Sequence, residues 1–357
     1  MRYFIIAGEA SGDLHASSIM KEIRGLDSSA EFQGMGGPQM IHEGLTVVHH
    51  MDEMNFMGFY EVVRNLSRVN KVLKNMKRAL KNYKPQKLIL VDFGGFNLRM
   101  AKYAKQLGIE VHFYILPKVW AWNESRLKKI KQFVDKGYVI FPFEEEYFRR
   151  GAVDATYCGN PTVEGLSAFF EHGLPKTVNP KQIALLPGSR PQEIKRILPV
   201  MLSIVPSFNN YQFVIAIGNN AHLLPEKLPA NVTVVSGSTY SIVYASKAAI
   251  VTSGTANLET ALLMTPQIVV YKANPLSYFI GKRLVKIKFI SPVNLILNKP
   301  LCRELIQNDC NQVTLTKAVE EVLGKDKSSE ILAGYEQLRK QLGDAHPSKE
   351  VASRIIG

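Results

Sequence analysis

The chain has 357 residues, which is too long for one ordinary hydrophobic core and predicts two domains. Its 46% hydrophobic and 21% charged residues are typical of a globular protein, and no apolar run reaches the ~18 residues that a membrane-spanning helix needs. The 44 Lys and Arg residues exceed the 31 Asp and Glu residues and give a formal net charge of +13, so we expect an acidic partner: nucleic acid, anionic lipid or a phosphorylated substrate.

The N-terminus and the cysteines both predict a cytosolic protein. The segment MRYFIIAGEASGD has too short an apolar core for a signal peptide. The three cysteines, Cys158, Cys302 and Cys310, show no spacing that is typical of a metal site, which agrees with a reducing compartment.

Residues 2–7 form the first predicted strand, and the sequence GEASGDLHA follows it. We expect Asp13 to open an amphipathic helix that continues through Leu26. The loop lacks the G-x-G-x-x-G pattern of dinucleotide sites, and Glu9 would repel a pyrophosphate there. Glu9 and Ser11 therefore suit sugar hydroxyl groups; the alternative is a helix-capping turn with a solvated Glu9.

Residues 32–40 predict a second strand that ends in a glycine turn, and residues 54–84 predict a basic amphipathic helix. No acidic residue interrupts the chain from Arg64 to Lys84. We expect this helix, with an exposed apolar group beside it, to rest on an anionic membrane surface. The apolar group comprises Met54, Phe56, Met57 and Phe59. The alternative is a domain helix whose outer face is simply charged. Both interpretations can be true, because an apolar stripe this wide must also pack on the sheet.

Residues 86–92 form the clearest buried strand of the first half, and this strand ends in Asp92. A carboxylate at the end of a buried strand, followed by glycines that leave room for a substrate, is a candidate general base. The alternative is that Asp92 caps the helix that starts near Asn97, although Asn97 can cap this helix itself.

A further strand over 110–116 precedes a loop that contains both tryptophans of the chain, Trp120 and Trp122. These rings either wall an acceptor pocket or anchor the loop to the core. A strand over 138–141 closes the first predicted sheet, and the chain crosses into a second domain near residues 160–165.

The second half contains a predicted phosphate-binding turn at QIALLPGSRPQE, residues 182–193. A buried strand over 183–186 breaks at a turn in which Gly188 lets the backbone approach a ligand. The following helix offers unpaired N–H groups near Ser189, and Arg190 can donate two hydrogen bonds to phosphate oxygens. The alternative is an ordinary turn with a solvated arginine.

A second turn of this kind follows the predicted strand over 248–252. It contains Ser253, Gly254 and Thr255, and the helix after it carries Glu259 in its first turn. In a parallel sheet the carboxyl ends of the strands share one edge, so both turns can hold one nucleotide diphosphate. Other strands are predicted over 213–217, 233–235 and 268–271; Gly218 and Asn219 follow the first of these.

Beyond residue 271 the chain has another basic amphipathic piece, residues 279–289, and then a loop from which Asn294 can reach the ligand cleft. The segments 315–323, 329–342 and 348–356 predict helices that fold back across the first domain.

With these elements placed, the sequence resembles the lipid-A-disaccharide synthase family of inverting glycosyltransferases. The matching segments run nearly from end to end: AGEASGD at 7–13, GMGGPQM at 34–40, VDFGGFN at 91–97, PKVWAW at 117–122, LLPGSR at 185–190, TSGTANLE at 252–259, KRLVK at 282–286 and PVNL at 292–295. The resemblance implies an α/β fold with two Rossmann-like domains (GT-B) that face each other across a cleft. We expect an acceptor-binding domain over 1–163, a UDP-sugar-binding domain over 164–335, and C-terminal helices over 336–357 that pack back on the first domain.

The resemblance also implies the reaction. UDP-2,3-diacylglucosamine and 2,3-diacylglucosamine-1-phosphate (lipid X) are joined to a β-1,6 disaccharide with release of UDP, in lipid A biosynthesis. Asp92 is then the base, Gly188, Ser189 and Arg190 hold the diphosphate, and Glu259 contacts the ribose. Glu9, Ser11 and Asn294 line the cleft, and Trp120 and Trp122 belong to the acceptor side. No cofactor is implied, and since the chain has no D-x-D pair, no metal is called for.

These substrates place the protein in the cytoplasm, peripherally associated with the inner face of the cytoplasmic membrane. Two rivals would share much of this sequence pattern: another GT-B enzyme that uses UDP-N-acetylglucosamine, and a UDP-sugar epimerase. A nucleic-acid partner is not expected, because the aromatic residues lie in apolar runs or beside glycine turns rather than among lysines. The sequence leaves acyl-chain length and oligomeric state open, a homodimer included.

Overall fold

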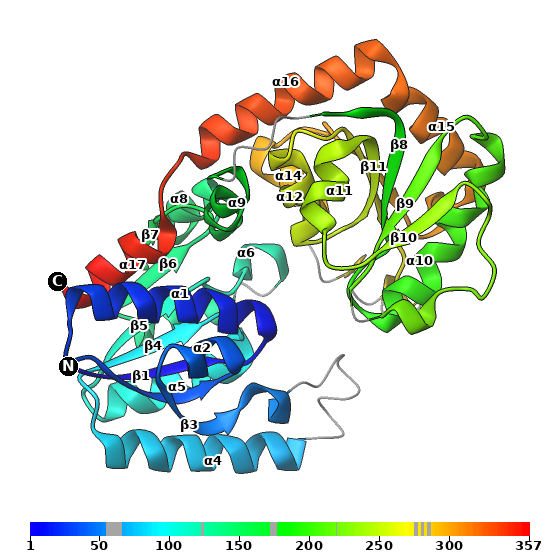
Figure 1. Ribbon diagram of the computed structural model, residues 1–357. Helices are drawn as coiled ribbons and strands as arrows, with labels where there is room; N and C mark the ends of the chain where they lie inside the picture. The colour runs from blue at the N-terminus through cyan, green and yellow to red at the C-terminus, as the bar shows by residue number, and fades with distance from the viewer. Residues whose placement is uncertain are drawn as a thin grey trace. The chain divides into compact units, whose positions relative to one another are not determined.

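The computed structural model describes residues 1–54, 66–122, 125–171, 177–218, 220–274, 278–279, 282–283 and 287–357. The chain divides into two compact units: unit 1 comprises Met1–Pro161 with Ala345–Gly357, and unit 2 comprises Thr162–Asp344. Each unit is a parallel sheet with helices (Figure 1), which confirms the predicted α/β class.

Unit 1 has a seven-stranded sheet in the order β3-β2-β1-β4-β5-β6-β7, and all neighbouring strands in it are parallel. The strands are β1 (Arg2–Ala7), β2 (Glu31–Gly36), β3 (Leu45–His50), β4 (Lys87–Val91), β5 (Glu110–Tyr114), β6 (Lys136–Val139) and β7 (Ala155–Tyr157). Ala7 pairs with Val91, and Val91 pairs with Tyr114. The three central strands therefore end level with one another.

Two helical layers cover this sheet. On one face, α1 (Ala10–Leu26) and α17 (Pro347–Ile356) bury apolar residues such as Ile19 and Ile355 against the strands. The other face carries α4 (Leu66–Tyr83), α5 (Gly94–Gln106), α7 (Ser125–Phe133) and α8 (Pro142–Arg150). The short elements are α2 (Pro38–His42), η1 (Met51–Met54) and α6 (Val119–Trp122). Burial on both faces explains why the central strands read as continuous apolar runs.

Helix α1 begins at Ala10, three residues before the predicted start at Asp13. The Asp13 carboxylate is buried and accepts hydrogen bonds from the backbone N–H groups of Gly37, Gln39 and Met40 at 2.7, 3.0 and 3.1 Å. Asp13 thus does not open its own helix; it ties α1 to the first turn of α2, whose N–H groups have no partner within that helix.

The predicted basic helix is present as α4 from Leu66 onward, and it packs on the sheet through Val72, Met76 and Leu80. The expectation of an exposed apolar group beside it is wrong for Met54, which is buried in the same core cluster. Phe56, Met57 and Phe59 lie outside the described residues.

Unit 2 has a six-stranded parallel sheet in the order β10-β9-β8-β11-β12-β13. The strands are β8 (Asn179–Leu186), β9 (Gln212–Ala216), β10 (Val232–Val235), β11 (Ser246–Thr252), β12 (Gln267–Tyr271) and β13 (Arg303–Ile306). The longer helices are α9 (Pro161–Glu171), α10 (Pro191–Ser203), α11 (Thr239–Ala245), α12 (Thr255–Leu262), α14 (Pro292–Leu297), α15 (Gln312–Leu323) and α16 (Lys325–Leu342). Most of the basic piece predicted over 279–289 lies outside the described residues.

Helix α16 belongs to unit 2 over its whole length, so the return to unit 1 begins at Ala345, nine residues later than the limit expected at residue 336. The Tyr335 hydroxyl accepts a hydrogen bond from Gln267 Nε2 at 3.1 Å, and Arg339 Nη2 donates to the Leu262 carbonyl at 2.6 Å. These contacts, the first buried and the second part-buried, hold α16 against the rest of unit 2. Of the C-terminal segments predicted to return to the first domain, α17 is the one that packs on the same sheet face as α1, whereas α15 and α16 belong to unit 2.

Replacing Asp13 by Ala leaves the buried N–H groups of Gly37 and Met40 and the part-buried N–H group of Gln39 without an acceptor. We therefore expect Asp13→Ala to lower the free energy of unfolding by about 2–3 kcal/mol in urea denaturation. Asp13→Asn keeps one acceptor oxygen and is expected to lose less. Unchanged stability of Asp13→Ala would show that water satisfies these N–H groups.

Candidate functional site

Unit 2 contains a cavity of about 450 Å³ at the carboxyl ends of β8, β9 and β11. It is lined by Leu186, Gly188, Ser189, Glu193, Ala216, Gly218, Asn220, Thr239, Thr252, Ser253, Gly254, Thr255, Ala256 and Glu259. The structure thus brings both predicted turns to one cavity, as the shared edge of a parallel sheet requires.

The first turn approaches the cavity through Gly188. Its φ is +110°, a backbone conformation that strongly favours glycine, and a Cβ there would lie 2.7 Å from Glu193 Oε2. Arg190 is the N-cap of α10, and its guanidinium, 59% exposed, lies 3.6 Å from the Glu193 carboxylate. Unlike Gly188 and Ser189, Arg190 does not line the cavity, although its ion-pair partner Glu193 does.

The second turn is fixed to the first by a hydroxyl group. Thr252 Oγ1 donates to the Leu186 carbonyl at 3.0 Å, and Ser253 Oγ donates to the Ile290 carbonyl at 2.9 Å. Gly254 is the N-cap of α12, which starts at Thr255. The first N–H groups of α12 therefore face a cavity whose walls are held by buried hydrogen bonds, and such a helix end attracts anions.

Glu259 lies half-buried in the wall of this cavity, and its Oε1 accepts a hydrogen bond from the Tyr240 hydroxyl at 3.0 Å. Burial raises the pKa of Glu259, while the bond from Tyr240 opposes this shift. Tyr240 fixes one oxygen of the carboxylate, which leaves acceptor capacity for a ligand hydroxyl group.

Several cavity residues escaped the sequence analysis, among them Glu193, Asn220 and Thr239. Asn220 Nδ2 donates to the Ser189 carbonyl at 2.7 Å and so connects the loop after β9 to the first turn. Gly218, which the sequence placed at this edge, does line the cavity, whereas Asn219 lies outside the described residues. Glu193 and Thr239 lie in the first turns of α10 and α11, and Asn220 lies in a loop, so no motif or periodic signal links them, and only the sheet order brings them together.

The prediction for Asn294 needs correction. Its side chain is fully buried in α14 and does not line the cavity. Its Nδ2 donates to Cys302 O and Glu304 Oε1 at 2.7 and 2.9 Å, and its Oδ1 accepts from Cys302 N at 2.9 Å. These bonds use the amide completely, so Asn294 anchors α14 to the segment that leads into β13.

In unit 1, Asp92 follows β4 directly, and both Asp92 and Phe93 have left-handed backbones, with φ of +47° and +51°. Two such residues in succession cost roughly 1–3 kcal/mol each and are typical of functional sites. The N-cap of α5 is Phe93, so the interpretation of Asp92 or Asn97 as the cap is wrong. Asn97 Nδ2 instead donates to the carbonyl groups of Val91 and Asp92 at 3.3 and 2.7 Å, which holds the strained turn.

The Asp92 carboxylate has an unusual environment. Burial raises its pKa, and this exceeds the opposing effects of the nearby Lys118 ammonium and of a hydrogen bond from the Phe93 N–H. A carboxylate whose pKa is raised, but which a cation still stabilises, is suited to accept a proton.

The loop that ends at Glu9 lies at the same edge of the sheet, and Ser11 lies in the first turn of α1 that follows it. Both residues are exposed, and Glu9 is the N-cap of α1. A Cβ at Gly8 would lie 2.5 Å from the Phe93 ring, so this loop packs directly on the turn that carries Asp92. The structure thus places the two loops together.

Trp120 fits the anchoring alternative. Its Nε1 donates to Glu144 Oε1 at 2.9 Å, and its ring meets Phe143 edge-on at 5.0 Å between centroids. Glu144, which the sequence analysis missed, is 1% exposed and also accepts from the N–H groups of Ile140 and Phe141. The side chain of Trp122 lies outside the described residues.

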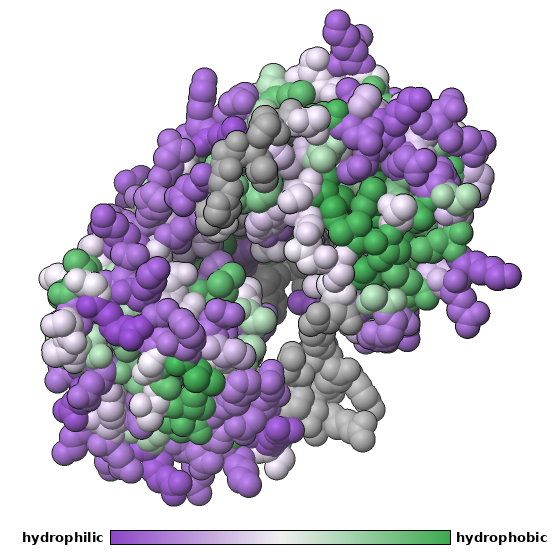
Figure 2. Space-filling view, viewed as in Figure 1, coloured by the Kyte–Doolittle hydropathy of each residue, from purple (hydrophilic) through white to green (hydrophobic). Residues whose placement is uncertain are grey.

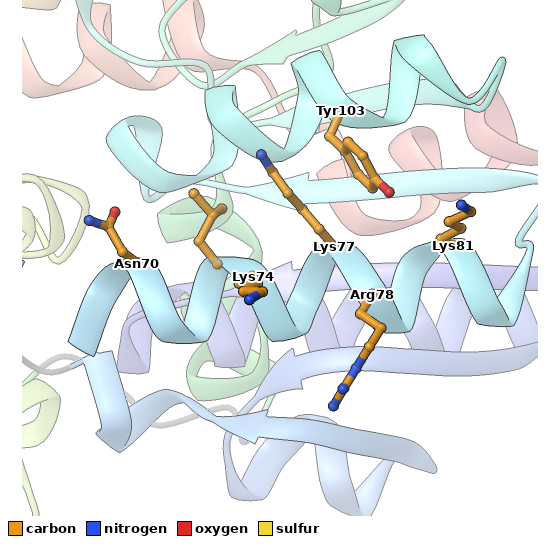
Figure 3. A pocket seen from close by; sticks show the side chains of 7 residues that line it. Asn70, Lys74, Lys77, Arg78, Lys81 and Tyr103 are labelled. Atoms are coloured by element: carbon orange, nitrogen blue, oxygen red, sulfur yellow. The ribbon is translucent and has the colours of Figure 1, made fainter. Parts of the chain in front are cut away.

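A second hollow, of about 460 Å³, lies between α4 and α5 (Figure 3) and is lined by Asn70, Leu73, Lys74, Lys77, Arg78, Lys81 and Tyr103. Lys77 Nζ lies 5.2 Å from the centre of the Tyr103 ring. No carboxylate lines this hollow, and the surface over α4 is almost wholly hydrophilic in Figure 2.

Among the residues that the structure describes, no group of three His, Cys, Asp or Glu side chains is placed to hold a metal ion. Nor does that part of the chain contain a helix long and apolar enough to cross a membrane.

Comparisons with known proteins cover nearly the whole chain. The family model described as lipid-A-disaccharide synthetase matches residues 3–355. A lipid-A-disaccharide synthase of Anaeromyxobacter sp. (strain K) is 35% identical over 368 residues, covering 99% of this chain and 96% of the relative.

Two solved structures share the fold. A UDP-GlcNAc 2-epimerase from Neisseria meningitidis, bound to UDP-GlcNAc, has a TM-score of 0.68 at 11% identity, with both chains covered completely. The glycotransferase of kitacinnamycin has a TM-score of 0.66 at 12% identity, over 99% of this chain and 98% of that one. At these identities the likeness concerns the fold alone. The family match, in contrast, covers the residues at both sheet edges. The chain therefore belongs to the lipid-A-disaccharide synthetase family.

Proposed function

We propose that this protein joins UDP-2,3-diacylglucosamine to 2,3-diacylglucosamine-1-phosphate and releases UDP, with inversion at the anomeric carbon. The observation that carries this proposal is the family match over residues 3–355, which spans the unit 2 cavity and the Asp92 turn alike. The name of the Anaeromyxobacter relative, lipid-A-disaccharide synthase, supports the same reaction.

The unit 2 cavity is the proposed donor site. Gly188 and Ser189 lie on one side, Gly254 and Thr255 on the other, and both turns precede a helix. The helix N-termini would bind the diphosphate, and Arg190 would neutralise charge that develops on the leaving UDP. Glu259 would accept a hydrogen bond from the ribose.

The edge of unit 1 is the proposed acceptor site. Asp92 takes the proton of the acceptor 6-hydroxyl group while the oxygen of that hydroxyl group attacks the anomeric carbon of the donor. The bond from that carbon to the UDP oxygen breaks, and the electron pair leaves with UDP. Glu9 and Ser11 would orient the acceptor sugar from the neighbouring loop. The reaction would need no metal, because helix N-termini and Arg190 supply the positive charge.

The rival of a UDP-sugar epimerase rests on fold likeness at 11% identity, whereas the family match spans the chain at far higher identity. The transferase is therefore the proposal that the findings favour. A UDP-sugar epimerase would form no disaccharide from the two acylated sugars, and the assay below separates the two.

We further propose that the face of unit 1 formed by α4, α5 and α7 contacts an anionic membrane. These helices hold six, three and four Lys or Arg residues, respectively, and no Asp or Glu. Each basic residue near an anionic surface contributes about 1 kcal/mol. Both proposed substrates carry acyl chains and phosphate, so this face would keep the enzyme where they reside.

We expect Asp92→Asn to lower kcat roughly 100- to 10,000-fold while UDP binding is retained, because the amide cannot take a proton. The pKa of Asp92 is raised. As the pH is lowered, the wild-type rate should therefore begin to fall at a higher pH than the usual pKa of an aspartate would predict. Disaccharide formation and UDP release, measured with chelator present, test this. Full activity of Asp92→Asn would contradict the mechanism, and so would a wild-type enzyme that loses its activity when chelator is added.

Arg190→Met should weaken UDP binding by about 1.5–3 kcal/mol, roughly tenfold or more in Kd, because a charge-assisted hydrogen bond is lost. Isothermal titration with UDP measures this. Lys195→Met, on the exposed side of the same helix, is the matched control and should bind like the wild type. Equal affinities of both variants would remove Arg190 from the donor site.

The triple variant Lys74→Gln, Arg78→Gln, Lys81→Gln should lose about 3 kcal/mol of binding to phosphatidylcholine vesicles that contain phosphatidylglycerol. Sedimentation with vesicles, with and without the anionic lipid, measures this. Lys21→Gln, Lys325→Gln, Lys349→Gln removes the same charge from exposed positions elsewhere. If both triple variants bind alike, net charge rather than this face controls the association.

A further inference from the structure

Glu144 is a buried carboxylate that the proposed mechanism does not use. It lies in the first turn of α8, and its two oxygens accept three hydrogen bonds. Trp120 Nε1 binds Oε1 at 2.9 Å, while the N–H groups of Ile140 and Phe141 bind Oε2 at 3.2 and 3.0 Å. Glu144 thus joins the segment after β5 to the segment after β6, both at the edge where Asp92 lies.

The segment that Trp120 belongs to, Pro117–Trp122, packs on the Asp92 turn. A Cβ at Gly94 would lie 2.7 Å from Pro117 Cγ, so these two segments are in direct contact. The Asp92 N–H also donates to the Tyr114 carbonyl at 2.9 Å. A displacement of residues 117–122 would therefore alter the surroundings of Asp92.

Lys118 is the charged residue of this segment. Its ammonium lies 4.7 Å from the centre of the Phe141 ring, next to the backbone that Glu144 holds. This ammonium acts on the carboxylates of both Asp92 and Glu144. Two further charged groups of the described residues belong to segments that pack on this turn. The Arg126 guanidinium of α7 would lie 3.9 Å from a Cβ at Gly94, and Glu9 directly follows Gly8, which packs on the Phe93 ring.

We infer that Glu144 is a positioning residue for the transfer reaction: by holding Trp120 and the backbone of residues 140–141, it fixes the Lys118 ammonium beside the Asp92 carboxylate. This inference rests on the proposed function of Asp92 as the base. Lys118 would keep enough Asp92 ionised to accept the acceptor proton, against the burial that favours its neutral form.

The test is the pH dependence of kcat/KM. In Lys118→Met a cation is lost, so the ionised form of Asp92 is less stable. The acid limb of the profile, where kcat/KM falls as the pH is lowered, should therefore move to higher pH. Glu144→Gln keeps the shape of the side chain but offers one acceptor oxygen to three donors. It should lower kcat about tenfold, since small displacements of reacting groups cost at least this much, and should move the acid limb in the same direction.

Trp120→Phe serves if Glu144→Gln fails to fold, because it keeps an aromatic side chain, although a smaller one, and removes the N–H donor to Glu144. It should shift the acid limb to higher pH as well, by less than Lys118→Met. UDP affinity should be unchanged in all three variants, since the unit 2 cavity is intact. The controls are Glu146→Gln, the same change at a half-exposed position of α8, and Lys21→Met on the surface of α1; both should behave like the wild type.

The outcomes separate the two proposals. If the acid limb stays in place in Lys118→Met while Asp92→Asn loses activity, the inference about Glu144 and Lys118 is overturned, but Asp92 remains the base. A limb that moves to lower pH in Glu144→Gln would also overturn it, because this is the direct effect of removing a negative charge near Asp92. If Asp92→Asn keeps full activity, the base assignment fails and the inference falls with it.

Discussion

Both sheets of this protein are parallel, and this constraint determines where chemistry can occur. Since all strands of a sheet point the same way, the loops that follow them gather along one edge. In unit 1 that edge collects the turns after β1, β4 and β5, and in unit 2 those after β8, β9 and β11. Residues as distant in sequence as Ser189 and Thr255 thereby line one cavity.

The edge of unit 1 stores strain that the rest of the unit stabilises. Asp92 and Phe93 keep left-handed backbones because Asn97 binds the carbonyl groups before them and because the loop at Gly8 packs on the Phe93 ring. Burial in this turn raises the pKa of Asp92. Strain and desolvation thus have one cause, which is the tight packing of three loops around one carboxylate.

The sequence predicts those elements whose signal is local. Buried strands such as β4 and β8 are runs of Val, Ile and Leu, and the turns after them contain glycines. The edge strands β3, β7 and β13 were missed, because they are short or half-exposed and lack this signal; the strand predicted to close the first sheet, β6, is followed by β7 at the edge. Glu144 and Asn294 show a different limit. From the sequence, Glu144 looks like a surface residue and Asn294 like a cleft residue. In the structure, Glu144 is a buried anchor for Trp120, 24 residues away. Asn294 is a buried anchor for Cys302 and Glu304.

The central claim is that the two units divide the work, with donor at the edge of unit 2 and acceptor at that of unit 1. Hydrogen–deuterium exchange of the whole chain with each ligand alone tests it most directly. UDP should protect residues 186–193 and 252–259, and 2,3-diacylglucosamine-1-phosphate should protect residues 7–15 and 91–97. Protection of the same segments by both ligands, or of unit 1 alone by UDP, would contradict the account.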